Sequence, residues 1–154
     1  MKVYGNDLMD IERKLSAVSA DDFSKVEVDA FLLLSRSEQY RKLSNVIAFL
    51  NLSNWKGTSM RDGVWTYYEC ADTEDIKITH KFLLDTGHNE IALHYVSGIR
   101  DYQNPIYQKE FDYPSEWLRD AELIDAWIFA NEKKIELAEY ELLIGIMRDL
   151  AVSI

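Results

Sequence analysis

Residues 63–97 read GVWTYYECADTEDIKITHKFLLDTGHNEIALHYVS, and their interpretation separates two fold classes. The aromatic run at 63–70 has the composition of a strand, and Ile76 and Ile78 alternate with polar residues as in a half-buried strand. With residues 91–96 as a third strand, this interpretation predicts a three-stranded meander within an α+β fold.

A second interpretation of the same stretch is helical. Thr73 precedes two acidic residues, which suit the first turn of a helix because its N-terminus carries partial positive charge. Gly87 follows the next apolar run, at the place where a glycine commonly ends a helix. Because start and stop signals agree at both ends, we favour helices over the meander.

Apolar residues recur at steps of three and four on both sides of this stretch, as in amphipathic helices. The helices expected there are residues 6–19, a helix capped at Asp21–Asp22, a helix capped by Ser37 and reaching Leu50, a helix starting at Pro114, and residues 132–152. Residues 51–60 and 100–112 are polar and predict loops. The sequence thus predicts an all-α fold, a single-domain helical bundle over residues 1–154 with about six or seven helices.

The composition excludes several classes of protein. The 154 residues include 27 acidic and 17 basic side chains, for a formal net charge of -10, which argues against direct binding of nucleic acid or an anionic membrane. The most apolar stretch, 142–147, is far shorter than the roughly 20 residues that span a bilayer. The first residues lack the apolar core of a signal peptide. The one cysteine, Cys70, is expected to pack as a small buried hydrophobe in a cytoplasmic protein.

No motif in the sequence predicts catalysis. His80, His88 and His94 lack the spacing that places two metal ligands on one helix face. There is also no glycine-rich phosphate loop and no nucleophile motif. We therefore expect no catalytic residue, no metal and no cofactor. The alternative is an enzyme that uses Cys70 or a histidine–carboxylate pair formed by the fold.

The excess acidity is concentrated near the C-terminus. Residues 101–154 hold 12 acids against 5 bases, whereas residues 1–100 hold 15 against 12. Such a surface is either only solvated or attracts a basic protein, whose association it would accelerate. The candidate residues for binding a basic partner are Asp120, Glu122, Asp125, Glu132, Glu136, Glu139, Glu141 and Trp117.

These observations favour a non-enzymatic, acidic protein-binding domain. Its partner would be a DNA-binding regulator, or a toxin for which the chain is the immunity protein, because both present clustered Arg and Lys. A structural role is a further alternative, in which Trp117, Trp127 and the final helix form a homodimer seam.

Three segments carry a resemblance to a known family. They are SEQYRKL at 37–43 with AFL at 48–50, DGVWTYYE at 62–69, and TGHNEIA at 86–92. Together they resemble a bacterial family of small, acidic, all-helical proteins, one branch of which is described as DNA mimics. Residues 61–64 read RDGV where that family has Asn-Gly-Gly. The resemblance implies an all-helical fold and an acidic surface that occupies the DNA-binding face of a basic protein, with no catalytic residues.

Overall fold

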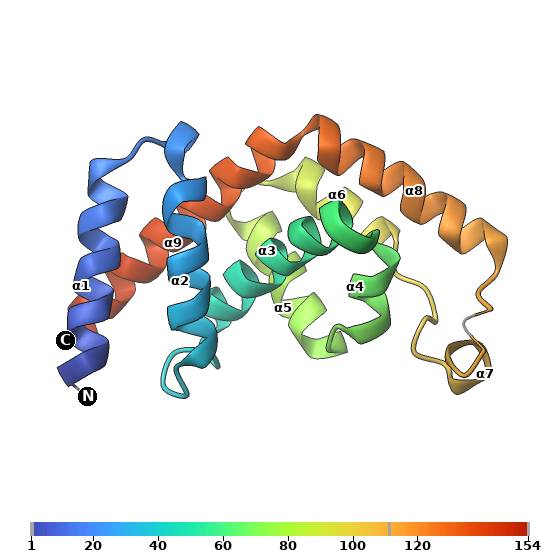
Figure 1. Cartoon of the computed structure of the whole chain (residues 1–154), viewed down its shortest axis with the longest axis horizontal. Helices are drawn as coiled ribbons and strands as arrows, with labels where there is room; N and C mark the ends of the chain where they lie inside the picture. The colour runs from blue at the N-terminus through green and yellow to red at the C-terminus, as the bar shows by residue number, and fades with distance from the viewer. Residues whose placement is uncertain (1, 111, 154) are drawn as a thin grey trace.

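The computed structural model describes residues 2–110 and 112–153, with side chains for residues 8–110 and 112–150. Over these ranges the backbone forms nine α-helices, one 3-10 helix and no strand (Figure 1). The elements are α1 (Lys2–Ala17), η1 (Ala20–Asp22), α2 (Ser24–Arg36), α3 (Ser44–Asp62), α4 (Trp65–Cys70), α5 (Thr73–Asp85), α6 (Asn89–Ser97), α7 (Pro105–Gln108), α8 (Ser115–Ala130) and α9 (Glu132–Ser153). The all-α prediction is confirmed, and the meander is wrong. The short helices α4 and α7, of 6 and 4 residues, account for the count above seven.

Helix α3 lies at the centre of the fold and packs against α2, α4, α5, α8 and α9 (Figure 1). Val46, Phe49, Leu52 and Trp55 are completely buried. These positions recur every three residues, which is less than one full turn, so the buried face winds around the helix. This winding lets α3 contact neighbours on several sides.

The end of α3 differs from the sequence-based prediction. Residues 51–60, expected as a loop, continue the helix to Asp62. Their polar side chains bind other elements: Ser53 Oγ, for example, donates to a carboxylate oxygen of Glu27 at 2.9 Å. Polar composition here reflects contacts between helices, which is why it resembled a loop in the sequence.

The start of α3 also differs from the prediction. Residues 37–43 form turns, and the helix begins only at Ser44. Ser37 is buried, and its Oγ accepts a hydrogen bond from the Tyr40 N–H at 3.2 Å. Ser37 thus caps a turn instead of the helix.

Helix α5 begins and ends with side-chain and backbone caps. One carboxylate oxygen of Asp72 accepts from the N–H groups of Glu74 and Asp75 at 2.9 and 3.1 Å. At the other end, Gly87 has a φ of +81°, a left-handed conformation that favours glycine. These caps delimit α5, the longest of the three helices in the ambiguous stretch.

A second positive-φ glycine forms the corner between α3 and α4. Gly63 has a φ of +94°. The next N–H, of Val64, donates to Asp125 of α8 at 2.9 Å, and Ser59 Oγ donates to the same oxygen at 2.5 Å. Asp125 therefore fixes this corner to α8, although the two lie far apart in the sequence.

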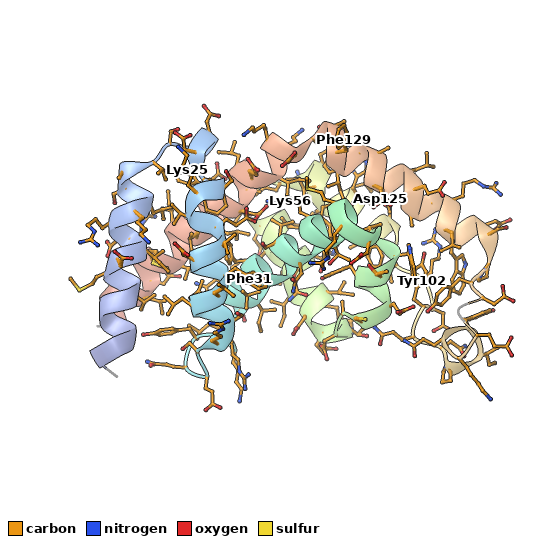
Figure 2. All side chains as sticks on the ribbon, in the orientation of Figure 1. Lys25, Phe31, Lys56, Tyr102, Asp125 and Phe129 are labelled. Carbon is orange, nitrogen blue, oxygen red and sulfur yellow. The ribbon has the colours of Figure 1, made fainter. Side chains whose placement is uncertain are left out.

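Helices α8 and α9 form a long bent pair along one side of the molecule (Figure 1). Ile135, Leu143 and Ile146 of α9 are completely buried, and α9 packs against α1, η1, α3 and α8. Phe129 lies at the outer edge of the corner between α8 and α9 (Figure 2). Among the described residues, no helix has the length and apolar character needed to cross a membrane.

Candidate protein-interaction surface

The structure disperses the eight residues that the sequence singled out for partner binding. Glu139 is completely buried, and Glu136 is 4% exposed, so neither lies on the surface. Glu132 is half-buried at the start of α9, whereas Glu122 and Glu141 are exposed. The expected acidic face on α9 is therefore largely internal.

Most of these acids also have partners within the chain. Arg100 pairs with Asp120 at 2.9 Å, and His88 Nε2 lies 2.9 Å from a carboxylate oxygen of Glu141. Asp125 holds the α3–α4 corner. Of the seven acidic candidates, Glu122 is exposed and forms no ion pair with a described residue.

Trp117 belongs to an internal aromatic cluster. Its ring centroid lies 5.4 Å from that of Tyr102, which is completely buried, and 5.1 Å from that of Tyr107. Tyr102 OH also donates to the Trp117 carbonyl at 3.1 Å. The tyrosines of residues 100–112 therefore pack against Trp117. Trp117 contributes to packing within the chain.

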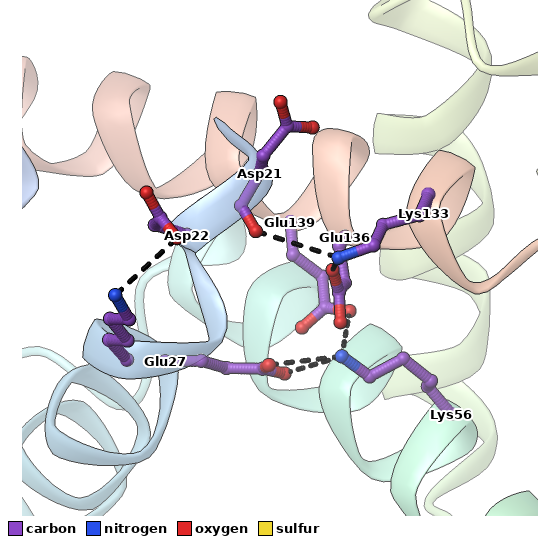
Figure 3. Close-up of polar contacts among 8 residues, drawn as sticks. Asp21, Asp22, Glu27, Lys56, Lys133, Glu136 and Glu139 are labelled. Carbon is purple, nitrogen blue, oxygen red and sulfur yellow. Dashed lines mark hydrogen bonds and ion pairs between the residues drawn. The ribbon is translucent and has the colours of Figure 1, made fainter. Parts of the chain in front are cut away.

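A buried charge cluster joins α2, α3 and α9. Lys56 Nζ lies 2.9 and 3.0 Å from the two carboxylate oxygens of Glu27 and 2.8 Å from one oxygen of Glu139 (Figure 3). The side chains of Lys56, Glu27 and Glu139 are 7%, 12% and 0% exposed. We call these three residues the buried charge cluster. Lys133 and Glu136, 3.4 Å apart, lie beside it (Figure 3).

The environment of the cluster separates the pKa values of its two carboxyl groups. Burial raises the pKa of Glu139 well above its usual value, and the hydrogen bond with Glu27 raises it further. Burial also disfavours the charge on Glu27, but the hydrogen bond from Glu139 and the charge of Lys56 lower its pKa. Burial opposes the charge of Lys56 as well, yet the two carboxyl groups raise its pKa. The two carboxyl groups are therefore shifted in opposite directions, and Glu139 holds a proton more readily than Glu27.

The sequence contains a signal for this cluster. Glu139 lies four residues after Ile135 and three before Leu142, which places it within the apolar stripe of the last helix. Lys56 lies four residues after the apolar Leu52, so it also falls on an apolar stripe of its helix. Charged residues at buried positions of two helices point to a buried ion pair.

Among the described residues, several exposed carboxylates without an ion pair lie on α8 or in the residues just before it. Glu110, Asp112, Glu116 and Glu122 are exposed, and none forms an ion pair with another described residue. Farther along the same helix, Leu123 and Phe129 are 67% and 77% exposed, and Ala126 and Ala130 are also exposed. We call the exposed side of α8 from Glu116 to Ala130 the α8 face. It combines the carboxylates of Glu116 and Glu122 and one exposed cation, Arg119, with uncovered apolar side chains.

A groove borders the α8 face on the side of α6. It encloses about 380 Å³, and its lining residues are His94, Ser97, Arg100, Asp120, Leu123, Ile124 and Trp127. The rings of His94 and Trp127 stack, with centroids 3.8 Å apart and planes 10° from parallel. These two rings form one wall of what we call the α6–α8 groove.

Glu90 holds this wall in place. Its carbonyl lies 2.9 Å from His94 Nδ1, and its carboxylate pairs with Lys134 of α9. The hydrogen bond from Lys134 lowers the pKa of Glu90, and a hydrogen bond from Trp127 contributes in the same direction. Residues from α6, α8 and α9 therefore meet at one carboxylate.

Of the residues considered for the enzymatic alternative, His88 is the one histidine that the described part of the structure pairs with a carboxylate side chain. Cys70 is exposed at the end of α4, so the expectation that it is buried is wrong. His80 is half-buried on α5, and His94 Nδ1 contacts a carbonyl instead of a carboxylate. His88 and Glu141 form a histidine–carboxylate pair, but no described group of three or more His, Cys, Asp or Glu side chains could hold a metal ion.

Comparison with protein-family models, with curated proteins and with solved structures finds no significant match to this chain.

Proposed function

We propose that this chain is a non-enzymatic binding protein that captures a basic protein through the α8 face. The observation that carries the proposal is the presence of unpaired Glu116 and Glu122 on the same helix face as the exposed Leu123 and Phe129. Burial of the apolar side chains would supply affinity, and the carboxylates would select and attract a partner rich in Lys and Arg.

The net charge of the chain also supports binding of a basic protein. At -10, the chain repels nucleic acid and attracts cationic surfaces over about a Debye length, roughly 10 Å at 0.1 M salt. A DNA-binding regulator and a nuclease toxin both offer such a surface. The resemblance to a family that includes DNA mimics belongs to this proposal and is consistent with the all-helical fold.

A pull-down from the native host tests the proposal. The wild-type chain is expected to retain a protein of basic pI at low salt and to lose it at high salt. The Glu116→Gln, Glu122→Gln double variant should retain less of that protein. Glu12→Gln, Glu38→Gln is the matched control, because both residues are exposed and lie outside α8. Equal retention by both double variants would contradict the role of the α8 face.

A further inference from the structure

We infer that the α6–α8 groove holds an apolar side chain of the partner, presented by a basic amphipathic helix lying along α8. This inference rests on the proposed function, and it adds the chemistry and the geometry of the contact. The groove supplies the anchor point, and the α8 face supplies the surface along which the helix lies.

The groove has the composition of an anchor pocket. Ile124 is buried, and Leu123 and Trp127 add apolar surface. Arg100 and Asp120 also line the groove. Their side chains form an ion pair at 2.9 Å, so their charges offset each other. Its volume of about 380 Å³ lies within the roughly 300–1,000 Å³ typical of small binding pockets. An apolar side chain therefore fits this site better than a charged one.

The wall of the groove is organised before any partner binds. Trp127 stacks on His94, and both are tied to Glu90, which Lys134 holds from α9. A side chain that is already fixed loses little conformational entropy on binding. Tryptophan is also among the residues most often found at the energetic centre of interfaces.

The pattern of the α8 face fits a helical partner. Leu123 and Trp127 are four residues apart, and Glu122 and Phe129 are seven apart, so each pair forms a row along α8. A second helix in this position would meet both rows with its own apolar stripe and would place flanking Lys or Arg side chains near Glu116 and Glu122.

Charge argues against a second copy of the chain as the occupant. Each copy carries a net charge of -10, and a symmetric contact through α8 would bring Glu116 and Glu122 of two copies together. A basic helix offers the opposite charge at the same positions. The occupant of the groove is therefore a cationic segment of another protein with one apolar face.

Two synthetic peptides test the inference. The first is an 18-residue helix former with Leu at helical spacing and Lys at the remaining positions. The second has the same Lys residues, with Ala in place of each Leu. Fluorescence anisotropy of labelled peptides gives the dissociation constants. The wild-type chain should bind the Leu peptide at least about tenfold more tightly than the Ala peptide, because a buried Leu side chain contributes that much or more.

Variants locate the binding site. Leu123→Ser should weaken binding of the Leu peptide about tenfold or more and leave the dissociation constant of the Ala peptide unchanged. Val28→Ser is the matched control, since Val28 is 61% exposed on α2 and Leu123 is 67% exposed. Both substitutions are at exposed positions, so both variants are expected to fold.

The outcomes separate the inference from the proposed function. If both peptides bind equally well, or if Leu123→Ser has no effect, the groove is not the anchor, and capture of a basic partner by charge still stands. If neither peptide binds at low salt, both the inference and the proposed function fail. If analytical ultracentrifugation shows a dimer that Leu123→Ser dissociates, a second copy occupies the groove and the inference is overturned.

Discussion

Lys56 Nζ lies 2.8 Å from a carboxylate oxygen of Glu139, and the two side chains are 7% and 0% exposed. All of α4 to α8 lies between them in the sequence, and the fold brings them together where α3 packs against α9. Glu27 also contacts Lys56, at 2.9 and 3.0 Å, so one largely buried ammonium group faces two carboxyl groups (Figure 3). The stability of the fold should therefore depend on the protonation of this site.

Glu139→Gln should change how stability depends on pH. The pKa of Glu139 is raised in the folded state, so the folded chain binds more protons than the unfolded chain above the ordinary value of 4.5. Wild-type stability should therefore fall as pH rises from 4.5 toward the folded pKa, by up to about 1.4 kcal/mol per pH unit. Gln resembles the protonated acid and should remove this loss, as measured by urea unfolding at several pH values.

Glu27→Gln should have the opposite signature. The folded pKa of Glu27 is lowered, so its contribution is present above about 4.5 and is lost as the pH falls through the folded pKa. At pH 7 this variant should be less stable than the wild type. Exposed Glu12→Gln serves as the control and should follow the wild-type profile. If stability depended on pH in the same way in all three variants, the opposite pKa shifts of Glu27 and Glu139 would be contradicted.

Lys56→Met should destabilise the fold severely. The substitution leaves Glu27 and Glu139 buried without a cation, and breaking a buried pair in this way costs about 3–5 kcal/mol. Lys77→Met is the control, because Lys77 is 68% exposed and forms a surface ion pair with Glu74. Chemical denaturation gives both values. A loss below about 1 kcal/mol for Lys56→Met would mean that water reaches the cluster.

The sequence predicted the class of fold because caps and apolar spacing are local. Thr73 and its acids indicated the start of α5, and Gly87 indicated its end, as the structure confirms. The end of α3 was not predictable in this way. Residues such as Ser53 and Ser59 have loop-like polarity, and their partners Glu27 and Asp125 become neighbours only in the folded chain.

The candidate site was predictable only in part. The concentration of acids near the C-terminus is visible in the sequence, and Glu122 is exposed as a binding residue requires. Composition could not show that Glu139 pairs with Lys56 or that Asp120 pairs with Arg100. The stacking of His94 on Trp127 was equally invisible, because it joins two helices across a turn-rich segment.

Gly57→Ala should stabilise the chain. Gly57 lies inside α3, and a Cβ atom there would meet no other atom within 4 Å. Alanine in a helix interior is more stable than glycine by about 0.5–1 kcal/mol. Thermal and urea unfolding should both show this gain. The circular dichroism of the folded chain should not change, because α3 is already helical at this position. A loss of stability would contradict the continuation of α3 through residues 51–60.

Gly63→Ala should destabilise the chain more than Gly87→Ala. Both glycines have positive φ, at +94° and +81°, but a Cβ on Gly63 would lie 3.2 Å from the Trp65 ring, whereas Gly87 has open space. Backbone strain of this kind costs about 1–3 kcal/mol, and the crowding at Gly63 adds to it. Urea unfolding of both variants gives the comparison. Equal losses would contradict a tightly packed corner between α3 and α4.

The proposed function requires that the carboxylates of the α8 face contact a basic partner. Its most direct test is the dissociation constant of the protein retained from the host, measured with the wild type and with Glu116→Gln, Glu122→Gln. At about 0.05 M salt the double variant should bind about two- to tenfold more weakly, and the difference should shrink at about 0.5 M salt. Equal affinities at low salt would contradict this role of the carboxylates.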